Sequence, residues 1–201
     1  DFDDFEKGIL LNKQSNDASI PVIYGTRLVG GTRVFMETSG TDNTYLYMAL
    51  VMCEGEINGI SEIRVDDKVV TFASSLADNT EVEVASSDGN FFKNSASLIR
   101  LEPHFGSDGQ SASSLLGTLS SWGSNHKLSG LAYLAIRFTW NQDAFNSIPK
   151  VQALVQGKKI VTLNSSLVES SPTFSANPAF CLLDYLRNER YGKGIPTADI
   201  D

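Results

Sequence analysis

Strand-forming segments dominate this 201-residue chain and constrain its fold more than any other feature. They are short, rich in Val, Ile, Tyr, Phe and Thr, and separated by Gly, Asp, Asn and Ser, which is the composition of β-strands and their turns. A chain of this kind folds as a mainly β protein, either all-β or a β-dominated α+β protein. The predicted strands are 20–24, 32–36, 45–53, 60–65, 68–72, 81–84, 98–102, 131–140 and 151–160.

Alternation of side chains is clearest in the segment LAYLAIRFTW, residues 131–140. Successive residues of a strand point to opposite faces, so Leu134 and Phe138 belong to a largely apolar face. Tyr133 and Arg137 belong to the other face, which mixes apolar and polar residues. The pattern predicts a strand with one buried side.

Beside a short helical signal around 113–119, the segment NPAFCLLDYLRNERYGKGIP at 177–196 strongly predicts an amphipathic helix that runs into a tight turn. Asn177 suits the N-cap because its side chain accepts a hydrogen bond from a free backbone N–H, and Pro178 suits the first helical position. Gly192 is the glycine expected just past a helix end, so the helix is predicted over 177–191. Apolar residues recur at helical spacing: Phe180, Leu183 and Leu186.

The charge balance excludes one large class of function. Sixteen basic and twenty-four acidic residues give a net charge of −8, and an acidic domain repels the phosphates of a DNA duplex. The same sign suits the wall of a channel through which DNA slides, although acidity that serves only solubility explains it equally well. No run approaches the roughly 18 apolar residues that a membrane-spanning helix needs.

Reactive side chains are few, and none is arranged for catalysis. The paired glutamates fit a charged turn between strands, the histidines fit surface or capping roles, and the cysteines fit core thiols rather than a disulfide. Two cysteines and two separated histidines do not make a zinc site. We therefore expect no catalytic residue, no cofactor and no metal. The residues considered are Glu54, Glu56, His104, His126, Cys53 and Cys181.

The chain starts with DFDDFEKG, without a methionine, and ends with TADID shortly after the predicted helix. We expect it to be a fragment of a longer polypeptide. Ser, Asn, Asp and Gly concentrate between the strand-rich parts, so residues 71–127 are expected to form an inserted, loop-rich subdomain. Residues 1–70 and 128–201 would then form one discontinuous domain.

Four segments, in this order along the chain, resemble the phage central tail hub family of tip attachment proteins, the lambda-like host specificity proteins. The helix segment contains the most specific sequence motif, N-x-A-x-x-L-x-D-x-L-x-x-x-R-Y-G-x-G. A second segment contains the turn E-G-x-I-x-G followed by a hairpin. The segments are 20–35, 48–70, 129–160 and 177–196.

This resemblance implies a tail-tube-like β-barrel or sandwich domain in the N-terminal region of a hub protein. It implies a structural protein that closes the distal end of the tail tube, supports host attachment and opens for DNA ejection. The expected partners are two further copies in a homotrimer, the distal tail protein and other tail-tip proteins, and the C-terminal part of the tape-measure protein. Phage DNA would pass without specific binding, and the host receptor would be bound by regions outside this chain.

Charged residues next to the family-like segments are the candidates for subunit contacts, although exposed strand arginines are equally expected without any contact. Two other classes of function are weighed against the hub: a carbohydrate- or receptor-binding β-module, for which Trp122 is the one candidate contact, and a cell-wall hydrolase, for which no acid–base pair is visible. The candidate interface residues are Arg27, Arg33, Glu54, Glu56, Arg187, Arg190 and Tyr191.

Overall fold

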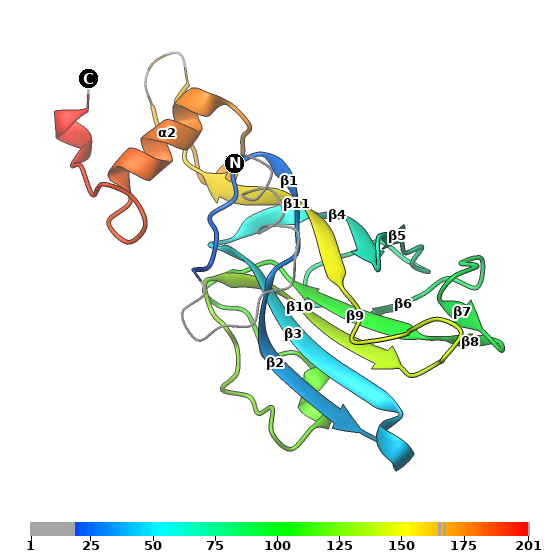
Figure 1. The fold of residues 1–201 in the computed structure, drawn as a ribbon. Helices are drawn as coiled ribbons and strands as arrows, with labels where there is room; N and C mark the ends of the chain where they lie inside the picture. Colours follow the sequence, from blue (N-terminus) through cyan, green and yellow to red (C-terminus); the bar gives the residue numbers. More distant parts are fainter. Residues whose placement is uncertain (1–18, 165, 167, 201) are drawn as a thin grey trace, which may run out of the picture.

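The computed structural model describes residues 19–164, 166 and 168–200, and it is mainly β, as the sequence predicts (Figure 1). Sheet A contains, in spatial order, β2 (Thr32–Ser39), β3 (Tyr45–Glu54), β10 (Leu131–Thr139), β9 (Ile99–His104) and β6 (Val82–Glu83). Sheet B contains β1 (Thr26–Val29), β11 (Val151–Ile160), β4 (Ile57–Val65) and β5 (Lys68–Val69), with β12 (Thr173–Phe174) also paired to β11. A small hairpin joins β7 (Phe92–Lys93) and β8 (Ala96–Ser97).

The two sheets pack face to face around the main core. Their inward side chains belong to one buried cluster, to which β10 contributes Leu134 and Ile136, and β11 contributes Ala153 and Val155. Cys53 at the end of β3 lies in this cluster, where burial raises the pKa of its thiol to about 11. A thiol with so high a pKa stays protonated and unreactive at neutral pH, which fits the predicted core role.

A second core covers the outer face of sheet A. The chain segment that carries η2 (Leu116–Thr118) folds back over the sheet, and Leu119 and Trp122 from this segment pack with Tyr133 and Ala135 of β10. Both faces of β10 are therefore buried, and the predicted single buried side was wrong. Trp122 is only 5% exposed, so the sequence-based suggestion that it is an exposed contact was also wrong.

Several predicted elements differ from the structure; the predicted strand 68–72, for example, forms only β5 and an isolated bridge at Phe72. Residues 20–24 form no strand; instead the carbonyl oxygens of Pro21 and Ile23 accept hydrogen bonds from the chain near the ends of β3 and β11. The predicted helix 177–191 is shorter, because α2 (Pro178–Arg187) ends where Asn188 turns to φ −74° and ψ 125°. The side chain of Asn188 then accepts hydrogen bonds from the next backbone N–H groups, which fixes a turn.

The segment 71–127 contributes β6 and β9 to sheet A as well as the loops around them. Its separation as an inserted subdomain stays a prediction. The described residues also include two further short 3-10 helices, η1 (Thr41–Asn43) and η3 (Thr197–Asp199). Among these residues, no helix is long and apolar enough to cross a membrane.

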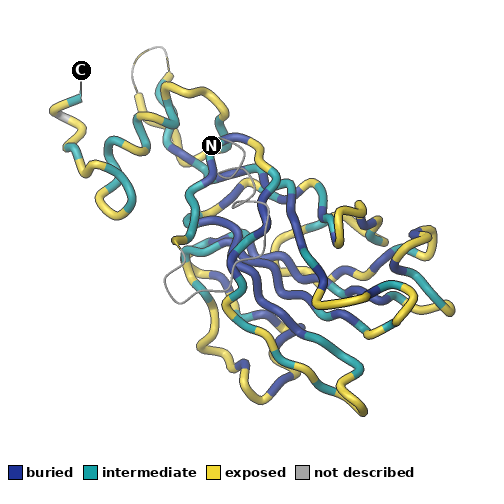
Figure 2. The backbone as a smooth tube through the Cα atoms, viewed as in Figure 1, coloured by how far each residue is buried: buried dark blue, intermediate teal, exposed yellow. Residues whose placement is uncertain are grey.

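Buried backbone concentrates in the two sheets, whereas α2 lies to one side of them with intermediate and exposed residues only (Figure 2). The helix contributes no side chain to either core cluster, although Phe180, Leu183 and Leu186 are partly buried. Polar contacts attach α2 to the sandwich, and these contacts define the candidate site.

Candidate functional site

The N-terminus of α2 forms as predicted. Asn177 is the N-cap, and its side-chain oxygen accepts the N–H of Ala179 at 3.0 Å, while Pro178 occupies the first helical position. This cap satisfies one of the free N–H groups that every helix start leaves. The start of the helix, and with it the direction in which its side chains point, is thus set locally by the sequence.

Asp184 in the middle of α2 connects the helix to the sandwich. Its carboxylate accepts hydrogen bonds from the hydroxyl of Tyr24 at 2.6 Å and from the hydroxyl of Tyr191 at 2.5 Å. The ammonium of Lys158 on β11 lies 3.3 Å from both carboxylate oxygens and also donates to the Tyr191 hydroxyl. We call these four residues the Asp184 cluster.

Burial and hydrogen bonding keep the two tyrosines of this cluster protonated. Burial raises the pKa of the Tyr24 and Tyr191 phenols above the usual value, and the neighbouring Asp184 raises both further. Both phenols therefore remain hydrogen-bond donors at neutral pH. A carboxylate with two phenol donors and an ammonium partner is nearly saturated, so the cluster is suited to fastening rather than to proton transfer.

Ion pairs surround the cluster at the surface. Arg190, just past the helix, pairs with Glu54 at the end of β3 at 2.8 Å. Arg187 on α2 pairs with Glu169 at 2.7 Å. Exposed ion pairs of this kind each contribute about 0–1 kcal/mol, so they orient the turn more than they stabilise it.

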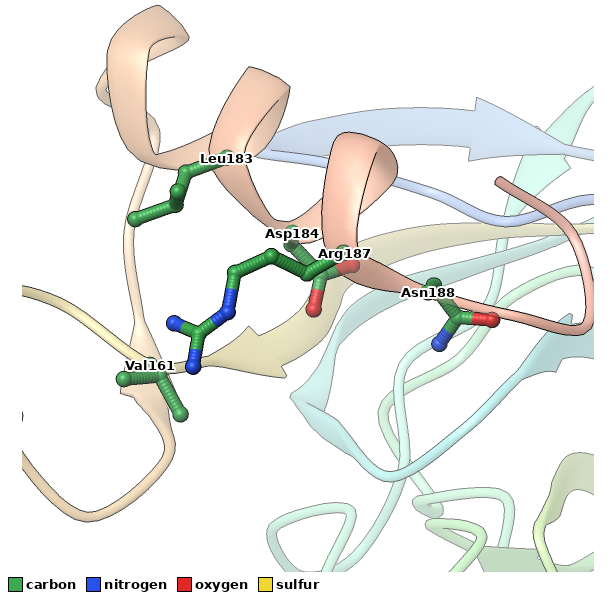
Figure 3. A pocket seen from close by; sticks show the side chains of 5 residues that line it. All are labelled: Val161, Leu183, Asp184, Arg187 and Asn188. Carbon is green, nitrogen blue, oxygen red and sulfur yellow. The ribbon is translucent and has the colours of Figure 1, made fainter. Parts of the chain in front are cut away.

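A small pocket lies between α2 and the end of β11 (Figure 3). Its volume is about 190 Å³, and Leu183 and Val161 provide apolar walls while Asp184, Arg187 and Asn188 provide polar groups. The Arg187 side chain extends from α2 toward Val161 in this view. The pocket marks incomplete packing beneath the helix.

The predicted interface residues divide into two groups. Glu54, Arg190 and Tyr191 come together at the base of α2, with Arg187 on the same helix. The other three lie elsewhere and are not brought to this site: Arg27 is exposed on β1, Arg33 is half-buried on β2, and Glu56 pairs with Lys159 at 2.5 Å.

Sequence reasoning missed the residues that anchor α2. None of Asp184, Tyr24 and Lys158 is among the sequence-based candidates: Asp184 lies in the predicted helix, and the other two lie in predicted strands. The sequence does contain one signal, because a lone acidic residue among the apolar positions of an amphipathic helix is unusual on the side that faces the protein. Two of its partners, Tyr24 and Lys158, are 160 and 26 residues away in the chain, which no local pattern reveals.

A second polar centre lies inside the molecule at Glu102 on β9, whose side chain is 1% exposed. Its carboxylate accepts hydrogen bonds from Ser113 Oγ at 2.6 Å, from the Leu115 N–H at 2.8 Å and from the N–H and hydroxyl of Ser114 at 3.2 Å. Burial alone would raise the pKa of this carboxyl, but the nearby His104 ring and these hydrogen bonds lower it to about 2. Glu102 thereby fastens the turn before η2 to sheet A.

His104 is fully buried beside Glu102, so the predicted surface role was wrong for this histidine. Its ring stacks on Tyr133 with centroids 4.3 Å apart, and its Nε2 lies 3.4 Å from the Glu102 carboxylate without hydrogen-bond alignment. His126 is exposed, and its Nδ1 accepts the Gly123 N–H at 2.8 Å, as a capping role requires.

Neither polar centre has the arrangement of an active site. The carboxylate oxygens of Asp184 and Glu102 both accept hydrogen bonds from groups that fix the fold. Within residues 19–164, 166 and 168–200, no group of three or more His, Cys, Asp or Glu side chains is placed to hold a metal ion. The chemistry available at both centres is hydrogen bonding that fixes one segment to another.

The fold and the site together define a β-sandwich module with a C-terminal helix that polar contacts attach to it. Comparison with known proteins relates this module to phage tail proteins. The chain is 27% identical over 215 residues to the baseplate hub protein pb3 of Escherichia phage T5, which makes it a distant homologue of a phage baseplate hub protein. The match covers 88% of this chain but only 23% of the length of pb3. No protein-family model matches the chain.

A solved structure shares the fold. One chain in the virion of a native gene transfer agent particle matches with a TM-score of 0.54 and 17% sequence identity. The match covers 94% of this chain and 36% of that chain.

Replacing Asp184 with alanine is expected to loosen α2 while leaving the sandwich intact. The change leaves Tyr24, Tyr191 and Lys158 without their shared acceptor, which weakens docking of the helix by about 2–4 kcal/mol. Hydrogen exchange of the α2 amides should accelerate, and exchange in β3 and β10 should not change. The exposed Glu189→Ala is the matched control, and unaltered α2 exchange in Asp184→Ala would contradict the anchoring role.

Proposed function

We propose that this chain is a structural part of the tail of a long-tailed phage, a central hub protein of the tip or baseplate that closes the distal tail tube. The observation that carries this proposal is the 27% identity to the T5 baseplate hub protein across 88% of the chain. The shared fold with a chain of the gene transfer agent virion supports it. In this role the protein is located in the virion, at the distal end of the tail.

Within the tip, the hub has the partners that the lambda-like tip attachment family implies. We propose a homotrimer in contact with the distal tail protein, with the C-terminal part of the tape-measure protein at its lumen. The assembly supports host attachment, and it opens on host contact so that DNA passes without specific binding. Regions outside this chain bind the receptor.

The contacts of the described residues favour a structural role over an enzymatic one. Glu102 is sealed beneath the η2 segment, and Asp184 is saturated by three donors. A receptor-binding module is less well supported, because Trp122, its candidate contact, is buried in the second core.

The change Leu183→Pro tests this function by breaking α2 in its middle. Proline there removes a backbone hydrogen bond and clashes with the preceding turn, at about 3 kcal/mol or more. We expect the chain to keep its sandwich, measured by far-UV circular dichroism, but phage that carry the change to yield no complete tails by electron microscopy. The control Leu183→Ala keeps a good helix former at the same position.

The assembly role of α2 is overturned if phage with the Leu183→Pro chain in their tails are infectious and form at normal yield. If the unmodified chain is missing from purified tails, as tested by mass spectrometry, the hub proposal itself fails.

A further inference from the structure

One side of α2 exposes apolar side chains. Leu182 is 56% exposed and Tyr185 is 37% exposed, and residues three apart on a helix lie on the same side. Asp184 and Leu183 point toward the sandwich, where Asp184 bonds to Tyr24 and Leu183 lines the pocket against Val161. Leu182 and Tyr185 therefore form a ridge that projects away from the chain's own core, and we call it the α2 ridge.

An apolar groove lies at the far end of the sandwich. It has a volume of about 230 Å³ and lies between the C-terminal part of β2, the start of β3, the end of β10 and the loop that follows β10. Three of its side chains are well exposed: Trp140 at 55%, Ile148 at 51% and Met36 at 41%. Exposed apolar surface that is gathered in one concave place marks an interaction site more often than scattered residues do.

The ridge and the groove lie at opposite ends of the molecule, so one copy cannot cover its groove with its own α2 (Figure 1). Resting on the proposed hub function, we propose that the α2 ridge of one copy docks in the groove of the next copy. Such a contact joins two different surfaces head to tail, and it closes into a ring when the rotation between copies allows. A ring of copies is what a hub around a tube needs.

Polar groups at the two surfaces match this pairing. The groove is lined by Thr38, Asn43 and Thr44 in addition to its apolar residues. The hydroxyls of Thr38 and Thr44 donate to Asn43 Oδ1 and to the Thr41 carbonyl, but their oxygens can still accept a hydrogen bond from the Tyr185 hydroxyl as its ring is buried. Buried tyrosine rings with a partnered hydroxyl are typical interface anchors.

The charges beside the groove and beside the α2 ridge are also complementary. Asp42 adjoins the groove residue Asn43, and Asp143 lies in the loop that forms one groove wall, both exposed. Lys193, in the turn after α2, is also exposed. Within the described part of the chain, none of these three residues forms an ion pair. The acidic border of the groove therefore complements the lysine beside the ridge.

Cysteine cross-linking between two differently labelled populations of the full chain tests the docking. One population carries Leu182→Cys with Cys181→Ser, and the other carries Ile148→Cys with Cys181→Ser. After mixing and assembly, a short bismaleimide should link the two introduced cysteines. The product is a covalent dimer that carries both labels on a denaturing gel. Adding Trp140→Ala to the second population should reduce this product about tenfold, as expected for loss of an anchor residue.

The matched control replaces Ile148→Cys with Val69→Cys, which is equally exposed at 49% but lies on β5, outside the groove. Product that forms equally well with the control, or not at all in an assembly that still forms, overturns the docking. A cross-link from Leu182→Cys to a different tail protein or within one chain also overturns it, because another occupant then covers the ridge. In each case the hub function stands if the chain is present in tails, so the two proposals fail separately.

Discussion

Replacing Glu102 with alanine is expected to lower the free energy of unfolding by about 3–5 kcal/mol, as removal of one member of a buried, hydrogen-bonded charged centre does. The carboxylate is the acceptor for Ser113, Ser114 and the Leu115 N–H, and its loss leaves buried donors without a partner. Chemical denaturation followed by tryptophan fluorescence measures the change. The control is Glu83→Ala, a more exposed glutamate on β6 of the same sheet, for which we expect little change.

The same carboxyl predicts how stability depends on pH. Its pKa is lowered in the folded state from an ordinary 4.5 to about 2, so the stabilisation is complete above pH 4.5 and is lost as the pH falls toward 2. The shift corresponds to about 3 kcal/mol. Glu102→Gln should flatten the stability profile between pH 4.5 and 2, and a profile as steep as that of the unmodified chain would contradict this assignment.

Replacing Gly157 with alanine is expected to destabilise the junction between β11 and the segment before β1. A Cβ atom at this position would lie 2.1 Å from the Ile23 carbonyl oxygen and 2.9 Å from the Gly25 carbonyl oxygen. Both clashes are with backbone, and the Gly157 N–H donates to Gly25 at 2.7 Å, so neither strand can move aside freely. We expect a loss of at least about 1–3 kcal/mol in unfolding experiments.

Because Tyr24 lies between the two contacted residues, Gly157→Ala should also accelerate hydrogen exchange in α2. The control is Gly109→Ala, where an added Cβ meets nothing within 4 Å and the stability should stay almost unchanged. Equal stability of the two variants would show that the close approach at Gly157 does not constrain the fold.

Local patterns in the sequence account for most of the strands and for the start of α2. Alternation predicts the strand β10, and the Asn177–Pro178 pair predicts the first turn of the helix, because each depends on near neighbours in the chain. What local patterns do not reveal is which faces meet. The mixed face of β10 is predicted to be partly solvent-exposed. Tyr133 on this face is nevertheless buried, because the segment that carries η2 covers it.

Local sequence patterns are limited in the same way at the candidate site. The arginines, glutamate and tyrosine near the helix were predicted as candidates for contacts between subunits, which stays a prediction; within the chain, Arg190 pairs with Glu54. The anchoring acceptor Asp184 is recognised only when its partners on distant segments are known. The predicted helix end is four residues too late, because the backbone leaves the helical conformation at Asn188, before the turn in which Gly192 donates its N–H to the Asn188 carbonyl.

The absence of buried side chains on α2 has a thermodynamic consequence. Because α2 contributes to neither core cluster, detaching it leaves both cores intact, and the opening changes the heat capacity and the denaturant m-value less than global unfolding does. The Asp184 cluster and the ion pairs at the surface contribute to this equilibrium, so it depends on ionic strength. The helix can therefore separate from the sandwich as a local opening, while the cooperative unfolding of the two sheets stays a distinct event.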